Sequence, residues 1–380
     1  MAMTAAIFSS NTNILSPPPQ RHPPLRSSSA LQFPVKYSTQ QFRYSSNYSS
    51  PAAPILSCVS AAAAEAATTT ADDLDSASIS TTSSWVEFAE KVSGEWDGFG
   101  ADFTAEGQAV ELPESVVPEA YREWEVKVFD WQTQCPTLAE TLGSSPSLTY
   151  RSIKLLPTVG CEADAATVYT SEERNISDAS AFAYASTGCY VAERRIDSAA
   201  KSVELEYCLI DPTNKESRVR VIQVLNLQES EPKLARIKVF VEQWYGPFRN
   251  GDQLGGCAIR DSAFAATDRL EASRVCGVWQ GIGAVARFDA SHNMIQQLGD
   301  ERASKSIRDE RGLVLLPKQL WSSVKRGGAA AADEICCEVG WLLDEGRAIT
   351  SKCIFSSEAE LKVNFSSLFY CCIYIHCNLQ

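Results

Sequence analysis

The heptapeptide Gly-Glu-Trp-Asp-Gly-Phe-Gly at residues 94–100 has a counterpart, Gly-Val-Trp-Gln-Gly-Ile-Gly, at residues 277–283. Both copies keep the tryptophan and three glycines, and each opens a stretch in which apolar and polar residues alternate. A tryptophan near the start of an all-β module suits one end of a barrel, and the glycines allow the first strand to bend as the sheet curls. The pattern predicts two tandem β modules.

Two further segments occur in the same order in both halves of the chain. Leu-Leu-Pro at residues 155–157 matches Leu-Leu-Pro at 315–317, and residues 188–195 match residues 340–347 at shared Gly, Glu and Arg positions. The interval between the copies shrinks along the chain. The second module has therefore lost loops or strands relative to the first.

The first 70 residues differ in composition from the rest. Up to Ala64 they contain no Asp or Glu, whereas Arg and Lys are scattered among many Ser, Pro, Thr and Gln residues. A secretory signal needs a compact apolar core behind a basic start, so this composition indicates an organelle transit peptide at residues 1–70, and its Ser and Ala content favours the chloroplast. We expect a chloroplast protein, in the stroma or associated with thylakoids, with a disordered linker at residues 71–84.

Net charge and cysteine spacing exclude several classes of protein. Residues 1–70 hold four of the 34 Lys and Arg residues and one of the 47 Asp and Glu residues. Removal of these residues leaves 30 basic residues against 46 acidic ones. Such an acidic protein repels polyanions, and we expect no nucleic-acid partner. The 13 cysteines show no Cys-x-x-Cys spacing and only three histidines occur, so we expect no metal site and no cofactor.

Alternation of apolar and polar residues predicts a first barrel at residues 85–250. Clear strands lie around residues 123–128, 203–209 and 236–242, and residues 85–91 are predicted to form a short lid helix. A linker at residues 251–269 follows, and a second barrel at residues 270–362 is short for eight strands.

Residues 363–380 carry no charge and are unlike anything upstream. Three interpretations remain open: an aberrant end that replaces the last strands, which we favour, a genuine buried strand, and a weak anchor. A membrane span needs about 20 predominantly apolar residues, and Asn, Ser and His interrupt this run, so we expect no transmembrane segment.

The two Gly-x-Trp openings, the Leu-Leu-Pro segments and the Gly-x-x-x-x-Glu-x-Arg segments together resemble an uncharacterised double-calycin family of cyanobacteria and chloroplasts. That family is a domain of unknown function, distantly similar to lipocalin-type bilin lyases. The resemblance covers residues 85–362. It implies an all-β fold with two tandem calycin (lipocalin-like) antiparallel barrels, the second smaller and not necessarily complete, but it brings no established reaction.

The resemblance also implies roles for four residues. Trp96 and Trp279 would each fill one end of a barrel. Arg195 and Arg347 would stack over these two indoles, as arginines do in lipocalins. These four residues would close the barrels.

Ligand contacts in the first barrel are expected from Trp124, Tyr207 and Trp244. Small barrels hold one small ligand, so the first hypothesis is a plastid protein that binds an apolar molecule (tetrapyrrole, carotenoid or lipid) without catalysis. The second hypothesis is a scaffold or assembly factor for a photosynthetic complex, with barrels filled by their own side chains. The third is a calycin-type isomerase or lyase, which a buried Glu or Tyr facing an open cavity would favour.

No catalytic residue is expected. The sequence has no Ser-His-Asp elbow, no Gly-rich phosphate loop and no H-E-x-x-H. Glu193 and Glu345 are carboxylates repeated in both modules. Each precedes an arginine by two positions, and we expect a solvated ion pair at both places.

Overall fold

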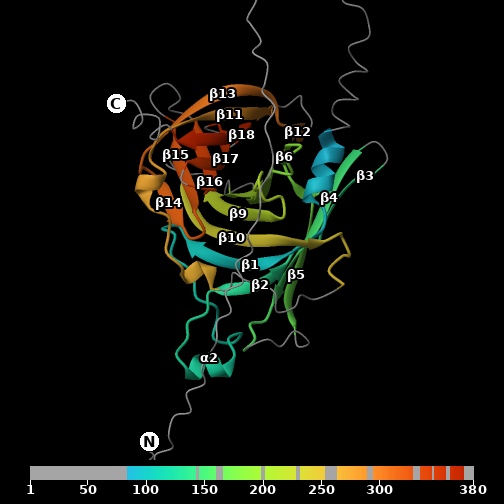
Figure 1. The fold of residues 1–380 in the computed structure, drawn as a ribbon, viewed down its shortest axis with the longest axis vertical. Helices are drawn as coiled ribbons and strands as arrows, with labels where there is room; N and C mark the ends of the chain where they lie inside the picture. The colour runs from blue at the N-terminus through green and yellow to red at the C-terminus, as the bar shows by residue number, and fades with distance from the viewer. Residues whose placement is uncertain are drawn as a thin grey trace, which may run out of the picture. The chain divides into compact units, whose positions relative to one another are not determined.

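A computed structural model describes residues 84–142, 145–159, 166–197, 202–227, 232–252, 263–288, 294–327, 334–344, 346–356 and 360–371. The predicted transit peptide lies outside these ranges, as does the predicted linker at 71–84 except for its last residue. Within the described residues, strands dominate and form two curled sheets, one a half-barrel and one a partial ring (Figure 1). This confirms the predicted all-β fold class with two modules.

The first sheet contains ten strands from the N-terminal half and one short strand from the C-terminal half. They are β1 (Glu95–Thr104), β2 (Asp130–Gln134), β3 (Thr137–Leu142), β4 (Ser145–Leu155), β5 (Val168–Asn175), β6 (Ala181–Tyr184), β7 (Tyr190–Asp197), β8 (Ser202–Ile210), β9 (Ser217–Asn226), β10 (Lys233–Gly246) and β12 (Ile295–Gln297). Their order among the described residues is β12-β6-β7-β8-β9-β10-β1-β2-β4-β3, with β5 paired to β4. All pairs are antiparallel except β12 with β6.

The first sheet curls strongly. Its first strand, β1, pairs with its last long strand, β10, along the whole of Glu95–Thr104. Tyr150 on β4 donates a hydrogen bond to Glu206 on β8, although four strands separate β4 from β8 in the hydrogen-bonded order. The face on which these side chains meet is therefore concave. No pairing among the described residues joins β5 to β6, so the sheet is open there.

Two glycines of the first heptapeptide explain how closely β1 approaches β10. A Cβ atom at Gly100 would lie 2.7 Å from the ring of Phe240, and one at Gly98 would overlap the carbonyl oxygen of Val241. Any larger residue would have to push the strands apart. The glycines thus permit the close pairing of β1 with β10.

The second sheet contains the remaining strands. They are β11 (Gly277–Arg287), β13 (Gly299–Arg308), β14 (Leu313–Leu316), β15 (Leu320–Arg326), β16 (Ile335–Leu342), β17 (Arg347–Phe355) and β18 (Leu361–Cys371), in the order β13-β11-β18-β17-β16-β15-β14. β11 carries the second Gly-x-Trp motif and pairs with the last strand, β18, as β1 pairs with β10. The repeat in sequence corresponds to a repeat in topology.

β18 corrects the prediction for the C-terminus. The expected end of the second module at residue 362 falls inside this strand, which is hydrogen-bonded on both sides, to β11 and to β17. Asn364 is fully buried, and its amide donates to Ser351 Oγ and to Lys352 O, both at 3.3 Å. Residues 363–371 thus belong to a genuine strand that pairs on both sides, rather than to an aberrant end. Residues 372–380 lie outside the described part of the chain.

The two sheets share one apolar core. Val221 of the first sheet and Val339 and Phe355 of the second are fully buried members of it. Gln223 on β9 also donates to Ser322 Oγ on β15 at 2.7 Å. Because burial of one large apolar side chain contributes ~1.5–3 kcal/mol, this core fixes the convex face of the first sheet against the second.

The predicted lid helix is present and spans residues 84–92. Its Trp85 and Phe88 pack among aromatic residues of β6 and β7, with ring centroids 4.9 Å from Tyr184 and 6.3 Å from Tyr190, respectively. The remaining helices in the described ranges are short: α2 (Glu119–Glu123), η2 (Ile176–Asp178), η3 (Phe264–Ala266) and η4 (Ala272–Arg274). The lid helix covers one end of the concave face.

Candidate functional site

Trp96 lies at the end of the concave face that the lid helix covers. Its ring is fully buried, and its indole nitrogen donates to Val92 O at 2.9 Å. The guanidinium carbon of Arg218, on β9, lies 4.1 Å from the ring centroid. The expected partner, Arg195, instead has a 42% exposed side chain and lies 3.6 Å from Glu193. Neighbouring residues of a strand point to opposite faces, and it is the residue before Arg195 that points inward.

Trp279 has an equivalent environment in the second module. Its ring is buried, and its nitrogen donates to Val275 O at 2.7 Å, again four residues upstream. Arg308 on β13 lies 5.5 Å from the ring centroid. The arginine found over this ring is therefore Arg308 and not the expected Arg347. Arg347 is the first residue of β17, and its Nε lies 2.6 Å from Asp344 Oδ2.

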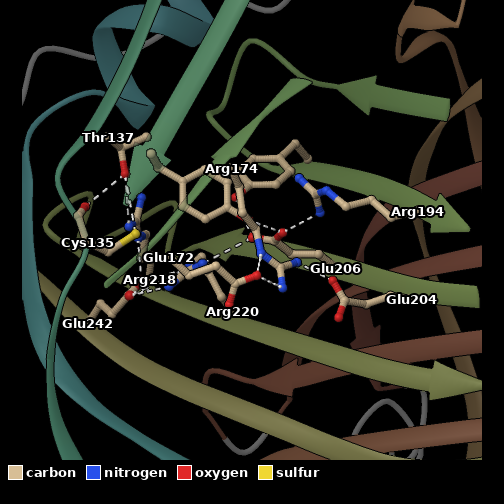
Figure 2. Close-up of polar contacts among 12 residues, drawn as sticks. Cys135, Thr137, Glu172, Arg174, Arg194, Glu204, Glu206, Arg218, Arg220 and Glu242 are labelled. Atoms are coloured by element: carbon tan, nitrogen blue, oxygen red, sulfur yellow. Dashed lines mark hydrogen bonds and ion pairs between the residues drawn. The ribbon is translucent and has the colours of Figure 1, made fainter. Parts of the chain in front are cut away.

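A buried ionic network fills the middle of the concave face (Figure 2). Glu242 on β10 accepts from Arg218 Nε at 2.7 Å and from Arg220 Nη2 at 2.9 Å. Burial alone would raise the pKa of the Glu242 carboxyl, but the two guanidinium groups outweigh burial and lower it. Glu242 is therefore ionised at neutral pH.

Glu206 on β8 is the second buried carboxylate of the network. It accepts from Arg220 Nη1 at 3.1 Å, Arg194 Nη1 at 2.8 Å and the Tyr190 hydroxyl at 2.8 Å, and also from the Tyr150 hydroxyl. Burial would raise the pKa of Glu206, but the neighbouring arginines hold it well below its usual range. Removing one partner of a buried ion pair costs about 3–5 kcal/mol of folding stability. The network therefore holds the side chains of Glu206, Glu242 and Arg220 in place.

A cavity of about 180 Å³ lies next to this network, between β4, β5, β9 and β10. Arg220 and Tyr150, both buried, form its floor, and Phe240 and Ile222 form an apolar wall. The other lining residues are more exposed and lie toward the mouth: Ser152, Lys154, Thr170, Glu172, Arg174 and Lys238. Among the described residues, side chains of the ionic network and of the lid helix occupy the concave face, and this small, polar cavity lies beside them.

Four cations and one carboxylate line this cavity. Arg220 is neutralised by the network, and Arg174 by Glu172 and Glu204. Lys238, in contrast, has no ion-pair partner among the residues that the structure describes. A ligand in the cavity would therefore meet an excess of positive charge.

The three predicted ligand residues are not brought together. Trp124 is 61% exposed and follows α2, so the expected strand at residues 123–128 is absent. Tyr207 is fully buried on the convex face, where its hydroxyl donates to Gln223 Oε1 at 3.2 Å. Trp244 is partly exposed at the end of β10 and donates to Ser93 O at 3.2 Å. None of the three lines the cavity.

Glu193 differs from its expected role as a solvated carboxylate. Its side chain is 2% exposed, and burial raises its pKa to about 7, while the nearby Arg195 acts in the opposite direction. Its repeat partner, Glu345, lies outside the described residues. Glu193 is on the convex face of β7, away from the cavity.

A wider groove of about 1100 Å³ runs along β14, with lining that mixes Leu313, Leu315 and Val324 with charged residues. No group of three or more His, Cys, Asp and Glu side chains is arranged to hold a metal ion in the described part. None of the described helices is long and apolar enough to cross a membrane.

Comparisons with known proteins give a fold likeness and no activity. No protein-family model matches the sequence, and no curated protein matches it significantly. A solved structure from the cyanobacterium Nostoc punctiforme, a protein of unknown function from the DUF3598 family, is 11% identical, with 76% of this chain and 98% of that chain covered and a TM-score of 0.45.

Proposed function

We propose that this protein is a plastid binding protein that holds a small anion in the cavity of its first module, without catalysing a reaction. The observation that carries the proposal is Lys238, which lines the cavity without an ion-pair partner among the described residues, beside the ion-paired Lys154, Arg174 and Arg220. A charge-assisted hydrogen bond to a carboxylate or phosphate is about twice as strong as a neutral one, so these donors favour anions.

The ligand class differs from the apolar molecule that the sequence suggested. A tetrapyrrole or carotenoid needs a large apolar chamber, whereas the interior here holds the Glu206 and Glu242 network and a cavity of only about 180 Å³. Desolvating those charged groups against an apolar ligand would be unfavourable. A carboxylate or phosphate compound of a few heavy atoms suits the cavity better.

The experiment is calorimetric titration of the full chain with lactate, phosphate and sulfate, and with glycerol as a neutral compound of similar size. We expect the anions to bind and glycerol not to bind. Lys238→Gln should weaken anion binding about tenfold, which corresponds to ~1.4 kcal/mol. Lys127→Gln is the matched control, because Lys127 is 70% exposed and lies away from the cavity. Equal affinity of both variants would contradict the proposal.

Targeting to the chloroplast is part of the same proposal and rests on the composition of residues 1–70. A fluorescent fusion of these residues should enter chloroplasts, and its retention in the cytosol would contradict the targeting. If no anion binds, the alternative of a scaffold for a photosynthetic complex is favoured, since the filled interior of the first module agrees with it. Co-purification of thylakoid proteins with the full chain then tests that alternative.

A further inference from the structure

Lys154 on β4 is the second lysine of the cavity, and its ammonium is held loosely. Its side chain is 23% exposed, and its Nζ lies 3.9 Å from Asp102 Oδ2 and 5.2 Å from the centroid of the Trp131 ring. The first distance is too long for a hydrogen bond. The amine is thus held by an ion pair without a hydrogen bond to Asp102, and the same side chain lines the cavity.

Burial and the neighbouring charges together lower the pKa of the Lys154 amine from its ordinary value. Burial lowers the pKa of the Lys154 amine, and the positive charges of Lys238 and Arg236 on β10 lower it further. The carboxylates of Asp102 on β1 and Glu172 on β5 act in the opposite direction without restoring the ordinary value. A lysine that is desolvated and lies beside another cation is an activated nucleophile.

We propose that the cavity takes small α-oxo carboxylates and that Lys154 holds them covalently as a reversible imine. This inference rests on the proposed function, because the carboxylate of the ligand is the anion that Lys238 attracts. The two lysines line the same cavity, so the carboxylate and the adjacent carbonyl carbon of one small molecule can meet both of them. Lys238 thus has two effects: it attracts the ligand and it disfavours the charged form of Lys154.

The reaction needs no co-reactant. The lone pair of Lys154 Nζ attacks the carbonyl carbon and gives a carbinolamine. The two hydrogens of the amine and the carbonyl oxygen then leave as one water molecule, and a carbon–nitrogen double bond replaces the carbon–oxygen double bond, so nothing is oxidised or reduced. Ser152 and Thr170 also line the cavity, and their hydroxyls are suited to donate to the departing oxygen.

Reductive trapping tests this inference directly. The full chain is incubated with pyruvate or glyoxylate and cyanoborohydride, digested, and mapped by mass spectrometry. We expect one carboxyalkyl group, on Lys154, formed at least about tenfold faster than on any exposed lysine, because burial lowers the pKa of the Lys154 amine and the cavity holds the oxo acid beside it. Since this readout uses the unmodified chain, it does not depend on the stability of a variant.

Three variants separate the role of Lys154 in forming the imine from the role of Lys238 in binding the carboxylate. Lys154→Arg keeps the positive charge but cannot form an imine, so the adduct should disappear; binding of lactate, which lacks the carbonyl group, is measured in the same variant. Lys238→Gln should still form the adduct on Lys154, but at about tenfold higher oxo-acid concentration. Lys127→Arg, at an exposed lysine, should change nothing.

Two results would contradict the proposal that Lys154 forms an imine. One is an adduct spread evenly over many lysines, and the other is an equal yield of adduct in Lys154→Arg. If either occurs while lactate binds and Lys238→Gln weakens that binding, only the covalent step is wrong and the proposed function stands. If lactate does not bind and no adduct forms, both proposals are wrong.

Discussion

The guanidinium carbon of Arg218 lies 4.1 Å from the centroid of the Trp96 ring, and both side chains are fully buried. Arg218 also donates to Glu242 Oε2 at 2.7 Å, so one side chain contacts an indole face and a carboxylate. Cation–π contacts of desolvated groups contribute about 2 kcal/mol. The end of the concave face is therefore stabilised by a trio of Trp, Arg and Glu.

The second module contains the same trio. Arg308 lies over Trp279 at 5.5 Å and over Trp321 at 5.3 Å, and its Nη2 is 2.7 Å from Glu338 Oε1. The carboxylate comes from β10 in the first module and from β16 in the second. The two modules thus use the same three residue types, but the arginines come from non-equivalent strands, because β13 pairs directly with β11 whereas β10 separates β9 from β1.

The first prediction concerns the arginine over Trp96. Arg218→Met should destabilise the protein by about 3–5 kcal/mol, because it leaves Glu242 buried with one partner fewer. Arg195→Met, at the residue that the sequence favoured, should cost less than about 1 kcal/mol, since its ion pair with Glu193 is partly exposed. Urea unfolding followed by tryptophan fluorescence measures both. An equal loss in the two variants would contradict the assignment of Arg218.

The sequence predicted where strands of the first sheet lie, but not which face of each strand points into the concave interior. The expected strands at residues 203–209 and 236–242 lie within β8 and β10. Alternation shows that two faces differ but not which one is inside. β8 and β9 are buried on both faces, and their charged residues, such as Arg218 and Arg220, point inward and form the ionic network.

The site was missed for the same reason. The signal available in the sequence was a pair of arginines two positions apart in β9, Arg218 and Arg220, and a pair of glutamates two positions apart in β8, Glu204 and Glu206. Charges that alternate on two consecutive strands can satisfy each other across a sheet. Pairing Arg220 with Glu242 requires the register of β9 and β10, which a single sequence does not contain.

The error at residues 123–128 has another cause. Trp124, Val126 and Val128 alternate with polar residues, but no described strand pairs with them. Pro118 starts α2 five residues earlier, and its fixed φ suits the beginning of a helix. Trp124 therefore caps a helix and stays exposed, packed only edge-on against Tyr121 at 6.2 Å.

The second prediction separates the tryptophans. Trp96→Ala should destabilise the protein by about 3–5 kcal/mol, as expected for a large buried aromatic side chain. Trp124→Ala should change stability by no more than ~0.5 kcal/mol, because its side chain is exposed, and it should leave anion binding unchanged. Chemical unfolding and calorimetric titration check the two expectations. Loss of anion binding in Trp124→Ala would favour the original ligand-binding assignment.

The third prediction concerns the buried carboxyl of Glu193. Burial raises its pKa from 4.5 to about 7, so the folded state binds this proton more tightly than the unfolded state. Its contribution to stability is fully present below pH 4.5 and is lost as the pH rises through 7. Glu193→Gln removes that loss, and the variant should be more stable than the parent at pH 8 by roughly 1–3 kcal/mol. The difference should be smaller at pH 5, and a pH-independent difference would contradict the role of this group.

The fourth prediction concerns Glu206, whose effect on stability changes with pH in the opposite direction to that of Glu193. Arg194 and Arg220 hold the pKa of Glu206 below its usual range despite burial. Such a group stabilises the fold above the unfolded pKa, and its contribution is lost as the pH falls. Glu206→Gln should therefore destabilise the protein at pH 7 by about 3–5 kcal/mol, and the difference should shrink below pH 4.5. The matched control is Glu111→Gln, which removes a carboxylate from an exposed pair with Lys127 and should cost less than about 1 kcal/mol. Urea unfolding at pH 7 and pH 4 distinguishes the two variants. If Glu206→Gln proves as mild as Glu111→Gln, the buried network does not stabilise the first module, and the rigid floor that the anion site requires is lost with it.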